Sequence, residues 1–316
     1  MGTDRTSRLR RWRWPIGILA FLFLAEIFLR TYYGFCDAVL LREDPHYEYI
    51  AEPSQDRWRF RHRIRYNSLS MRSEEPDSAA VVLLGCGDSV INGGVLTDQD
   101  SLATTLLSDR LSETFKRKVQ VLNISAGSWG PDNCTAYLEH TTVPTAKAIV
   151  LFVSSHDAHD NMSFKKVVGV KAGFPKEQYR SAIVELVDRY LLPKIWKRNT
   201  GLDSDLGIDK HEEAFNPGFA GMKEYAETRG IPFVIFLHAE ASEIRSGVYN
   251  AQGQEIIHFA REYGIPLVMD LDHGVGTDLL RDKIHPDEGG QRKMAEILFR
   301  DIMQRPEQYG LARTQE

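Results

Sequence analysis

Short apolar runs alternate with longer amphipathic stretches between residues 77 and 305. Each run is rich in valine, isoleucine or leucine and is bounded by small or polar residues, a pattern typical of buried parallel strands. The runs predict five strands, at residues 79–84, 119–123, 148–154, 232–237 and 266–269. Strands that alternate with helices predict an α/β fold with a doubly wound parallel sheet.

Amphipathic stretches predict helices at residues 101–115 and 176–192, and a last helix that ends near Met303. Pro193 ends the second of these, which has one apolar side. Residues 158–231 are too long for a simple crossover, so we expect an insertion there that covers the site. Residues 306–316 are expected to form a tail.

The N-terminal segment has a different pattern. A cluster of five arginines between residues 5 and 13 precedes an apolar run from Trp14 to Leu29, and three aromatic residues follow by Phe35. This pattern predicts a basic cytoplasmic tail at residues 1–13 and an uncleaved transmembrane signal anchor at residues 14–33. Because arginines stay on the cytoplasmic side, everything that follows is expected outside the cytoplasm, in the periplasm or at the cell surface.

Residues 34–76 carry three prolines among many charges and are predicted to be a linker or small subdomain. Within them, residues 57–66 place arginine at every odd position and mostly aromatic or aliphatic residues at the even ones. This alternation predicts one β-strand with a cationic and an apolar face. The cationic face either holds an anionic glycan or lipid head group, or is a solvated edge.

Composition excludes several classes of protein. A hydrophobic content of 42%, a charged content of 26% and a net charge of -5 describe an ordinary globular protein and give no case for nucleic-acid binding. The three cysteines are too scattered for a disulfide scaffold, and Cys86 is expected to pack as a small apolar residue. An extended segment at residues 156–160 would split its histidines and aspartates between two faces, so neither a metal nor another cofactor is expected.

The stretch from Gly85 to Val90 reads as a strand that turns sharply into a helix. Ser89 would lie at the carboxyl end of a central strand, where open α/β sheets bind ligands, and is therefore a candidate nucleophile. The alternative is that Ser89 only caps the next helix. A dinucleotide-binding interpretation fails because the third glycine of that motif is missing.

Asp282 and His285 are separated by two residues on the loop after the fifth strand. That spacing lets the carboxylate reach the imidazole Nδ1 and leaves Nε2 free. Ser89, His285 and Asp282 therefore form a possible catalytic triad.

Residues 77–305 resemble the SGNH (GDSL-like) hydrolase family. Gly87-Asp88-Ser89 looks like its nucleophile block, and residues 123–130 look like its glycine block. Residues 154–157 look like the block that usually reads Gly-x-Asn-Asp, and residues 282–285 like the closing Asp-x-x-His block. The resemblance implies a flavodoxin-like, three-layer α/β/α sandwich with a five-stranded parallel sheet.

The resemblance also implies roles for individual residues. Ser89 would be the nucleophile, His285 the general base and Asp282 the carboxylate that orients it. The oxyanion hole would use the N–H of Ser89, the N–H of Gly127 and a side chain at position 156, where His156 replaces the usual asparagine. Ser128 or Gly130 are alternatives to Gly127. Further candidates for substrate binding are Asp88, Trp129 and Asn161.

The segment from Tyr66 to Arg72 is similar to the Asn-Ser-x-Gly-x-Arg lead-in of membrane-anchored bacterial SGNH proteins, with Ser70 where glycine is usual. Together these features lead us to expect a membrane-anchored serine esterase. Its partners would be the membrane, through the N-terminal helix, and an O-acyl ester, first of all an acetyl ester, of a carbohydrate or lipid. Two alternatives stay open: an O-acetyltransferase acting on an envelope polysaccharide, and a non-catalytic glycan-binding module.

Overall fold

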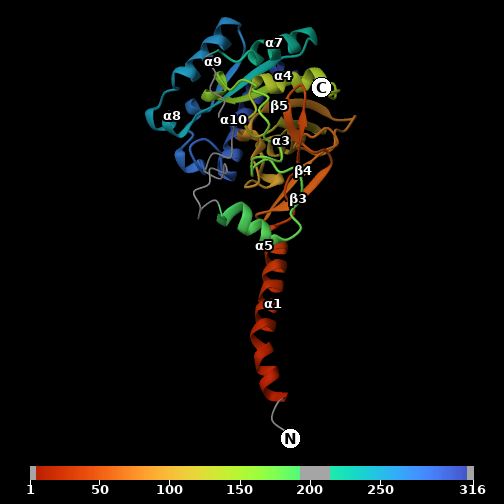
Figure 1. The fold of residues 1–316 in the computed structure, drawn as a ribbon. Coiled ribbons are helices and arrows are strands. Elements are labelled where there is room, and N and C mark those ends of the chain that lie inside the picture. Colours follow the sequence, from red (N-terminus) through yellow and green to blue (C-terminus); the bar gives the residue numbers. More distant parts are fainter. Residues whose placement is uncertain (1–4, 193–213, 312–316) are drawn as a thin grey trace.

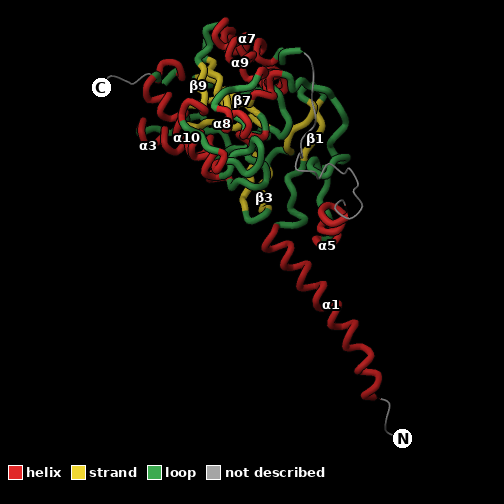
Figure 2. Tube along the Cα trace, turned by 90° about the vertical axis from the view of Figure 1, so that its left-hand side faces the viewer, coloured by secondary structure: helices red, strands yellow, loops and turns green. Residues whose placement is uncertain are grey.

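The computed structural model describes residues 5–192 and 214–311, with side chains from Trp14 onward. Helix α1 (Arg5–Tyr33) projects as a long stalk from a rounded body (Figures 1 and 2). Its part from Trp14 to Tyr33 has a mean hydropathy of 1.6 and no residue buried against the rest of the chain. The helix is therefore long and apolar enough to be a membrane span or signal anchor.

The body is built on a five-stranded parallel sheet with the order β6-β5-β7-β8-β9. Its strands are β5 (Val81–Gly87), β6 (Val119–Ser125), β7 (Ala148–Ser154), β8 (Phe233–His238) and β9 (Leu267–Met269). All five predicted strands are confirmed, with ends shifted by at most three residues. This is the flavodoxin-like order, in which the chain reverses its winding direction beside β5 and leaves a crevice at the carboxyl ends of β5 and β7.

Helices cover both faces of the sheet and give three layers. Side chains that alternate along the strands belong to two separate cores, as period-2 geometry requires. One core contains α3 (Ala103–Phe115) and α10 (Glu288–Gln304). The other contains α4 (Pro131–His140), α7 (Gly218–Thr228) and α9 (Ala251–Glu262). Cys86 lies fully buried in the second core, as expected.

Shorter elements shape the edge of the sheet where the strands end. They are α2 (Ser89–Asn92), η1 (Gln99–Ser101), η2 (Ser155–Ala158), α8 (Ala241–Ser246), η4 (Asp270–His273) and η5 (Thr277–Leu279). The linker contains two antiparallel pairs, β1 (Leu41–Asp44) with β2 (Glu48–Ala51), and β3 (Gln55–Arg59) with β4 (His62–Tyr66).

The prediction of one strand at residues 57–66 is wrong, because the segment turns back on itself as the hairpin β3–β4. Phe60 and Arg61 have φ of 48° and 72°, the left-handed conformation of a tight two-residue hairpin turn. The uniform cationic face is therefore lost. Arg59 is buried and pairs with Glu185, while Arg63 and Asp56 form an exposed ion pair on neighbouring strands.

The predicted helix at residues 176–192 is shorter than expected. It begins after Ser181, whose hydroxyl caps the N–H of Val184, and continues as α5 (Ala182–Glu185) and η3 (Leu186–Leu191). This described part of the predicted insertion packs against α1 and the linker. The side-chain amide of Gln178 accepts a hydrogen bond from the N–H of Ala38 and donates one to its carbonyl. Residues 193–213 lie outside the described residues, and α7 forms the crossover helix to β8.

The predicted tail is also wrong for the residues that the structure describes. After α10 the chain forms η6 (Pro306–Tyr309), and Tyr309 and Leu311 are fully buried in the core beside α10. The Tyr309 hydroxyl donates to Asp301 at 2.6 Å. Residues 306–311 therefore belong to the folded domain.

Candidate active site

Ser89 lies where β5 turns into α2. The turn needs glycine at position 87, because a Cβ there would lie 2.7 Å from the carbonyl oxygen of Phe152 on the adjacent strand. Asp88 caps α2 by accepting the N–H of Val90 at 2.8 Å. Ser89 is thereby held at the carboxyl edge of the sheet, partly exposed, and is not itself the helix cap.

The structure brings Ser89, His285 and Asp282 together in one hydrogen-bonded chain. His285 Nε2 lies 2.9 Å from Ser89 Oγ, and His285 Nδ1 lies 2.7 Å from Asp282 Oδ2. Burial alone would raise the pKa of Asp282, but the hydrogen bonds from His285 and from two backbone N–H groups hold it well below its usual value. The carboxylate is therefore charged and fixes His285 with Nε2 turned to the serine.

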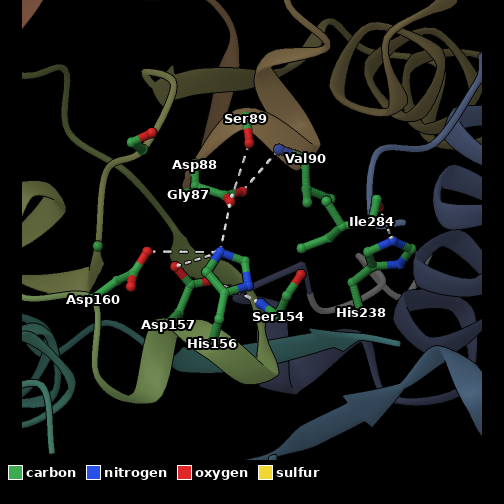
Figure 3. Close-up of polar contacts among 12 residues, drawn as sticks. Gly87, Asp88, Ser89, Val90, Ser154, His156, Asp157, Asp160, His238 and Ile284 are labelled. Carbon is green, nitrogen blue, oxygen red and sulfur yellow. Dashed lines mark hydrogen bonds and ion pairs between the residues drawn. The ribbon is translucent and has the colours of Figure 1, made fainter. Parts of the chain in front are cut away.

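A second histidine–aspartate pair lies directly behind the triad loop. His238 Nδ1 lies 2.5 Å from Asp270 Oδ2, and His238 Nε2 lies 2.8 Å from the carbonyl oxygen of Ile284 (Figure 3). Because both partners are acceptors, both ring nitrogens donate, so His238 is an imidazolium. Burial would lower its pKa, but Asp270 and the Ile284 carbonyl raise it above the ordinary value.

His238 thus holds the peptide that immediately precedes His285. Sequence reasoning missed this pair, since a histidine at the end of β8 and an aspartate after β9 carry no spacing signal. The predicted strands place both residues at strand ends, but only the order of the strands, which the structure gives, shows that they meet.

His156 lies at the end of β7, on the other side of the crevice from Ser89, and is surrounded by carboxylates (Figure 3). Its Nε2 lies 3.8 Å from Asp88 Oδ2, 3.9 Å from Asp157 Oδ1 and 3.8 Å from Asp160 Oδ2. Its Nδ1 lies 3.4 Å from Glu240 Oε1. Burial would lower the pKa of His156, but these carboxylates raise it to about 10.

The expectation that an extended segment separates these groups is wrong. Residues 155–158 form the turn η2, which brings His156 close to Asp157 from the opposite face of an extended segment, and Asp88 joins them from the end of β5. One ligand atom each from Asp88, His156 and Asp157 lies within 4.8 Å of the others. Spacing that is unconvincing along the chain thus becomes a compact cluster in the fold.

The structure treats the two predicted oxyanion donors Gly127 and His156 differently. A Cβ on Gly127 would meet no described atom within 4 Å, so its backbone borders open space. The hydroxyl of Tyr49 donates a hydrogen bond to the carbonyl oxygen of Gly127 at 2.7 Å. His156 instead directs both ring nitrogens to carboxylates. Donation from His156 to an ester oxygen stays a prediction, and one that this arrangement does not favour.

Two of the three candidates for substrate binding are almost fully buried and hydrogen-bonded within the protein, and their contact with a substrate stays a prediction. Trp129 is 1% exposed, and its indole N–H donates to the carbonyl of Tyr49 at 2.8 Å. Asp88 is 2% exposed and is occupied with the α2 cap. Asn161, which is partly exposed, donates to the carbonyl of Ala214 at 3.1 Å.

The lead-in segment supports the loop that follows Ser89. Arg72 is fully buried and donates to the carbonyls of Asn92, Gly94 and Thr97, the last at 2.7 Å. Ser70 has φ of 62°, a left-handed conformation that glycine adopts most easily. This conformation explains why glycine is usual at that position in the similar motif.

No protein-family model and no curated protein sequence matches the chain. Solved structures with a similar backbone include a lipase/acylhydrolase from Enterococcus faecalis, 13% identical, covering 75% of this chain and 100% of its own length, with a TM-score of 0.44. The psychrotrophic esterase EstA from Pseudoalteromonas is 12% identical over 72% of this chain and 98% of its own, with a TM-score of 0.42. TesA is 16% identical over 70% and 97%, also with a TM-score of 0.42.

Proposed function

We propose that the chain is a serine esterase of SGNH type that transfers the acyl group of an ester to Ser89 and then to water. One observation carries this proposal: the continuous hydrogen-bonded path from Asp282 through His285 to Ser89, in which the histidine and the serine lie 196 residues apart along the chain. Such a path activates a serine hydroxyl, which is a poor nucleophile by itself.

The chemical steps follow from this path. His285 Nε2 accepts the proton of Ser89 Oγ as the oxygen attacks the ester carbonyl, and Asp282 stabilises the imidazolium that forms. In this proposal the N–H groups of Ser89 and Gly127 stabilise the oxyanion. The imidazolium then gives its proton to the leaving alcohol, and a water molecule, activated in the same way, releases the acid and restores Ser89.

The substrate class follows from the anchor. If α1 spans the membrane, the catalytic body lies close to its surface, and the arginines at the N-terminal end place that body outside the cytoplasm. Accessible esters there are O-acyl groups on envelope carbohydrates and lipids. An acetyl ester of such a molecule is the substrate that we propose.

Covalent labelling with a fluorophosphonate tests the nucleophile. The full chain in detergent should be labelled at Ser89, and Ser89→Ala and His285→Ala should abolish labelling. Ser242→Ala, which removes an exposed serine on α8, and His258→Ala, which removes an exposed histidine on α9, are matched controls that should leave it unchanged. Equal labelling of Ser89→Ala and the unchanged chain would refute the proposal.

Acyl transfer to a sugar remains a second candidate, because an acyl-serine can be attacked by a sugar hydroxyl as well as by water. Incubating the full chain with an acetyl ester, with and without an envelope glycan, separates the two reactions. Hydrolysis predicts the same release of acetate in both samples and an unmodified glycan. An acetylated glycan would favour transfer, and saturable glycan binding without turnover would favour the binding module.

A further inference from the structure

The carboxylates around His156 stand at an unusual distance from it. Elsewhere in the site, histidine and aspartate touch directly, at 2.5 Å for His238 with Asp270 and at 2.7 Å for His285 with Asp282. Nε2 of His156 instead lies 3.8–3.9 Å from three separate carboxylate oxygens, beyond the range of a hydrogen bond. Of these groups, Asp88, His156 and Asp157 each offer one ligand atom within 4.8 Å of the other two.

The spacing of these atoms suits a metal ion. Ligand atoms bound tetrahedrally at roughly 2.0 to 2.3 Å from a cation lie roughly 3.3 to 3.8 Å from one another. The distances of 3.8 to 3.9 Å measured from His156 Nε2 lie at or just above the upper end of this range. Imidazole together with carboxylates is a donor set for Zn²⁺ or Mn²⁺.

The buried carboxylate of Asp157 points independently to a ligand. Its side chain is 1% exposed, and Oδ1 has no hydrogen-bond partner among the described residues, although that oxygen faces Nε2 of His156 (Figure 3). Oδ2 accepts the N–H of Ser154 at 2.7 Å, which fixes the direction of the carboxylate. A buried carboxylate oxygen held in place without a hydrogen bond needs a cation nearby. Without a metal, the protonated ring of His156 is that cation; a bound metal ion would take the place of the proton on Nε2.

Glu240 completes the arrangement behind the ring. Its Oε1 lies 3.4 Å from Nδ1 of His156, on the side opposite the cluster. Histidines that bind metals commonly give their second N–H to a carboxylate, which fixes the ring and strengthens the ligand nitrogen.

We propose that Asp88, His156 and Asp157 bind one divalent cation of the Zn²⁺ or Mn²⁺ type, with the carboxylate of Asp160 beside this group. Asp88 Oδ2 lies 3.4 Å from Ser89 Oγ, so the cation lies within about 6 Å of the nucleophile. In a role that rests on the proposed esterase function, it acts as an electrophile for the ester carbonyl, in place of the side-chain amide that His156 replaces.

Metal uptake tests the site without reference to activity. The full chain in detergent is stripped with EDTA, dialysed against Zn²⁺ or Mn²⁺ alone, and its metal content is measured by mass spectrometry. One cation per chain is expected. Asp157→Asn and His156→Gln should each weaken binding by at least about tenfold, and His258→Ala, which removes an exposed histidine paired with Glu262, should not.

A second variant guards against misfolding. Asp160→Asn removes the charge of a less deeply buried carboxylate beside the three ligands and should also weaken uptake, while circular dichroism checks that each variant is folded. The proposal is overturned if the stripped chain takes up neither metal, or if folded Asp157→Asn and Asp160→Asn variants bind as tightly as the unchanged chain.

The two proposals fail separately. Fluorophosphonate labelling of Ser89 without metal uptake would overturn the cation site and leave the esterase. Uptake without labelling would overturn the esterase and leave the site. If uptake occurs but ester cleavage is the same in the stripped and loaded chain, the electrophilic role is wrong.

Discussion

Asp282 shows how one residue sets both the orientation and the charge of the base. It accepts three hydrogen bonds from Ile284 and His285, one of them from the imidazole Nδ1. These bonds keep its pKa low, so the carboxylate stays charged throughout the neutral range. An uncharged amide in its place would favour the wrong tautomer of His285.

We therefore predict that Asp282→Asn lowers kcat for an acetyl ester by about 10³- to 10⁴-fold with little change in thermal stability. Steady-state kinetics on a chromogenic acetyl ester measure this effect. Asp272→Asn, at an exposed aspartate in the same region, is the control and should retain full activity. A loss of less than tenfold would show that the Asp282–His285 contact does not matter for the reaction.

His238 makes a contribution to stability that depends on pH. Its pKa is raised in the folded protein, so the contribution is complete below the unfolded value of about 6.5 and is lost as pH rises through the higher folded value. The difference in melting temperature between the unchanged chain and His238→Gln should therefore shrink as the pH rises above about 6.5. If this difference in melting temperature stays constant or widens as the pH rises, His238 is neutral in the folded protein.

The variant His238→Gln also tests whether His238 positions His285. Because His238 holds the Ile284 carbonyl, its loss should lower kcat and leave KM nearly unchanged. A change in KM alone would argue against a role in placing His285.

At the scale of elements, α1 and α5 are joined by a charged contact in an apolar setting. Glu26 of α1 accepts hydrogen bonds from the Ser181 hydroxyl at 2.9 Å and from the N–H groups of Ala182 and Ile183 at 2.8 and 3.0 Å. These donors form the first turn of α5, which lies at the junction of stalk and body (Figure 1). The anchor is thus attached to the body by specific bonds as well as by the chain itself.

Replacing Glu26 by alanine should release the start of α5, because its N–H groups lose their acceptor. Limited proteolysis would detect the change as faster cleavage between residues 178 and 192. Glu224→Ala, at an exposed glutamate position on α7 far from this contact, serves as control. Unchanged cleavage would show that other contacts, such as the Arg59–Glu185 ion pair, suffice to hold α5.

Elements also show where pattern reasoning is strong and where it fails. The five strands were predictable because each is a buried run with clear ends. Residues 57–66 alternate as a strand does, yet the pattern carries no information on φ, and the turn at Phe60 and Arg61 divides them into a hairpin. The residues from 306 onward were predicted to be a tail after the last helix, although Tyr309 and Leu311 return to the core.

At the scale of the whole molecule, the distribution of arginine predicts the orientation in the membrane. Alkaline phosphatase fused after residue 316 should be active, since the positive-inside rule places the body outside the cytoplasm. Replacing the five arginines of residues 5–13 by glutamine should reduce that activity. A fusion that is inactive, while a fluorescent cytoplasmic reporter at the same place is bright, would contradict the predicted topology.

Sequence alone determined the features that depend on neighbours along the chain. The strand and turn that present Ser89, the Asp282–His285 spacing and the apolar run of α1 are all local, and each could be predicted from residue type and period. The pairing of Ser89 with His285 required only the further rule that parallel strands end at one edge of the sheet.

Tertiary structure alone decided which side chains meet across that edge. Strand order places the end of β7 beside the end of β5, so His156 meets Asp88, and it places β9 beside β8, so His238 meets Asp270. Contacts between separate strand ends depend on lateral order and on the exact turn that follows each strand. Neither the lateral order nor the turns leave a periodic trace in the sequence. The carboxylates around His156 and the His238–Asp270 pair therefore became visible only in the fold.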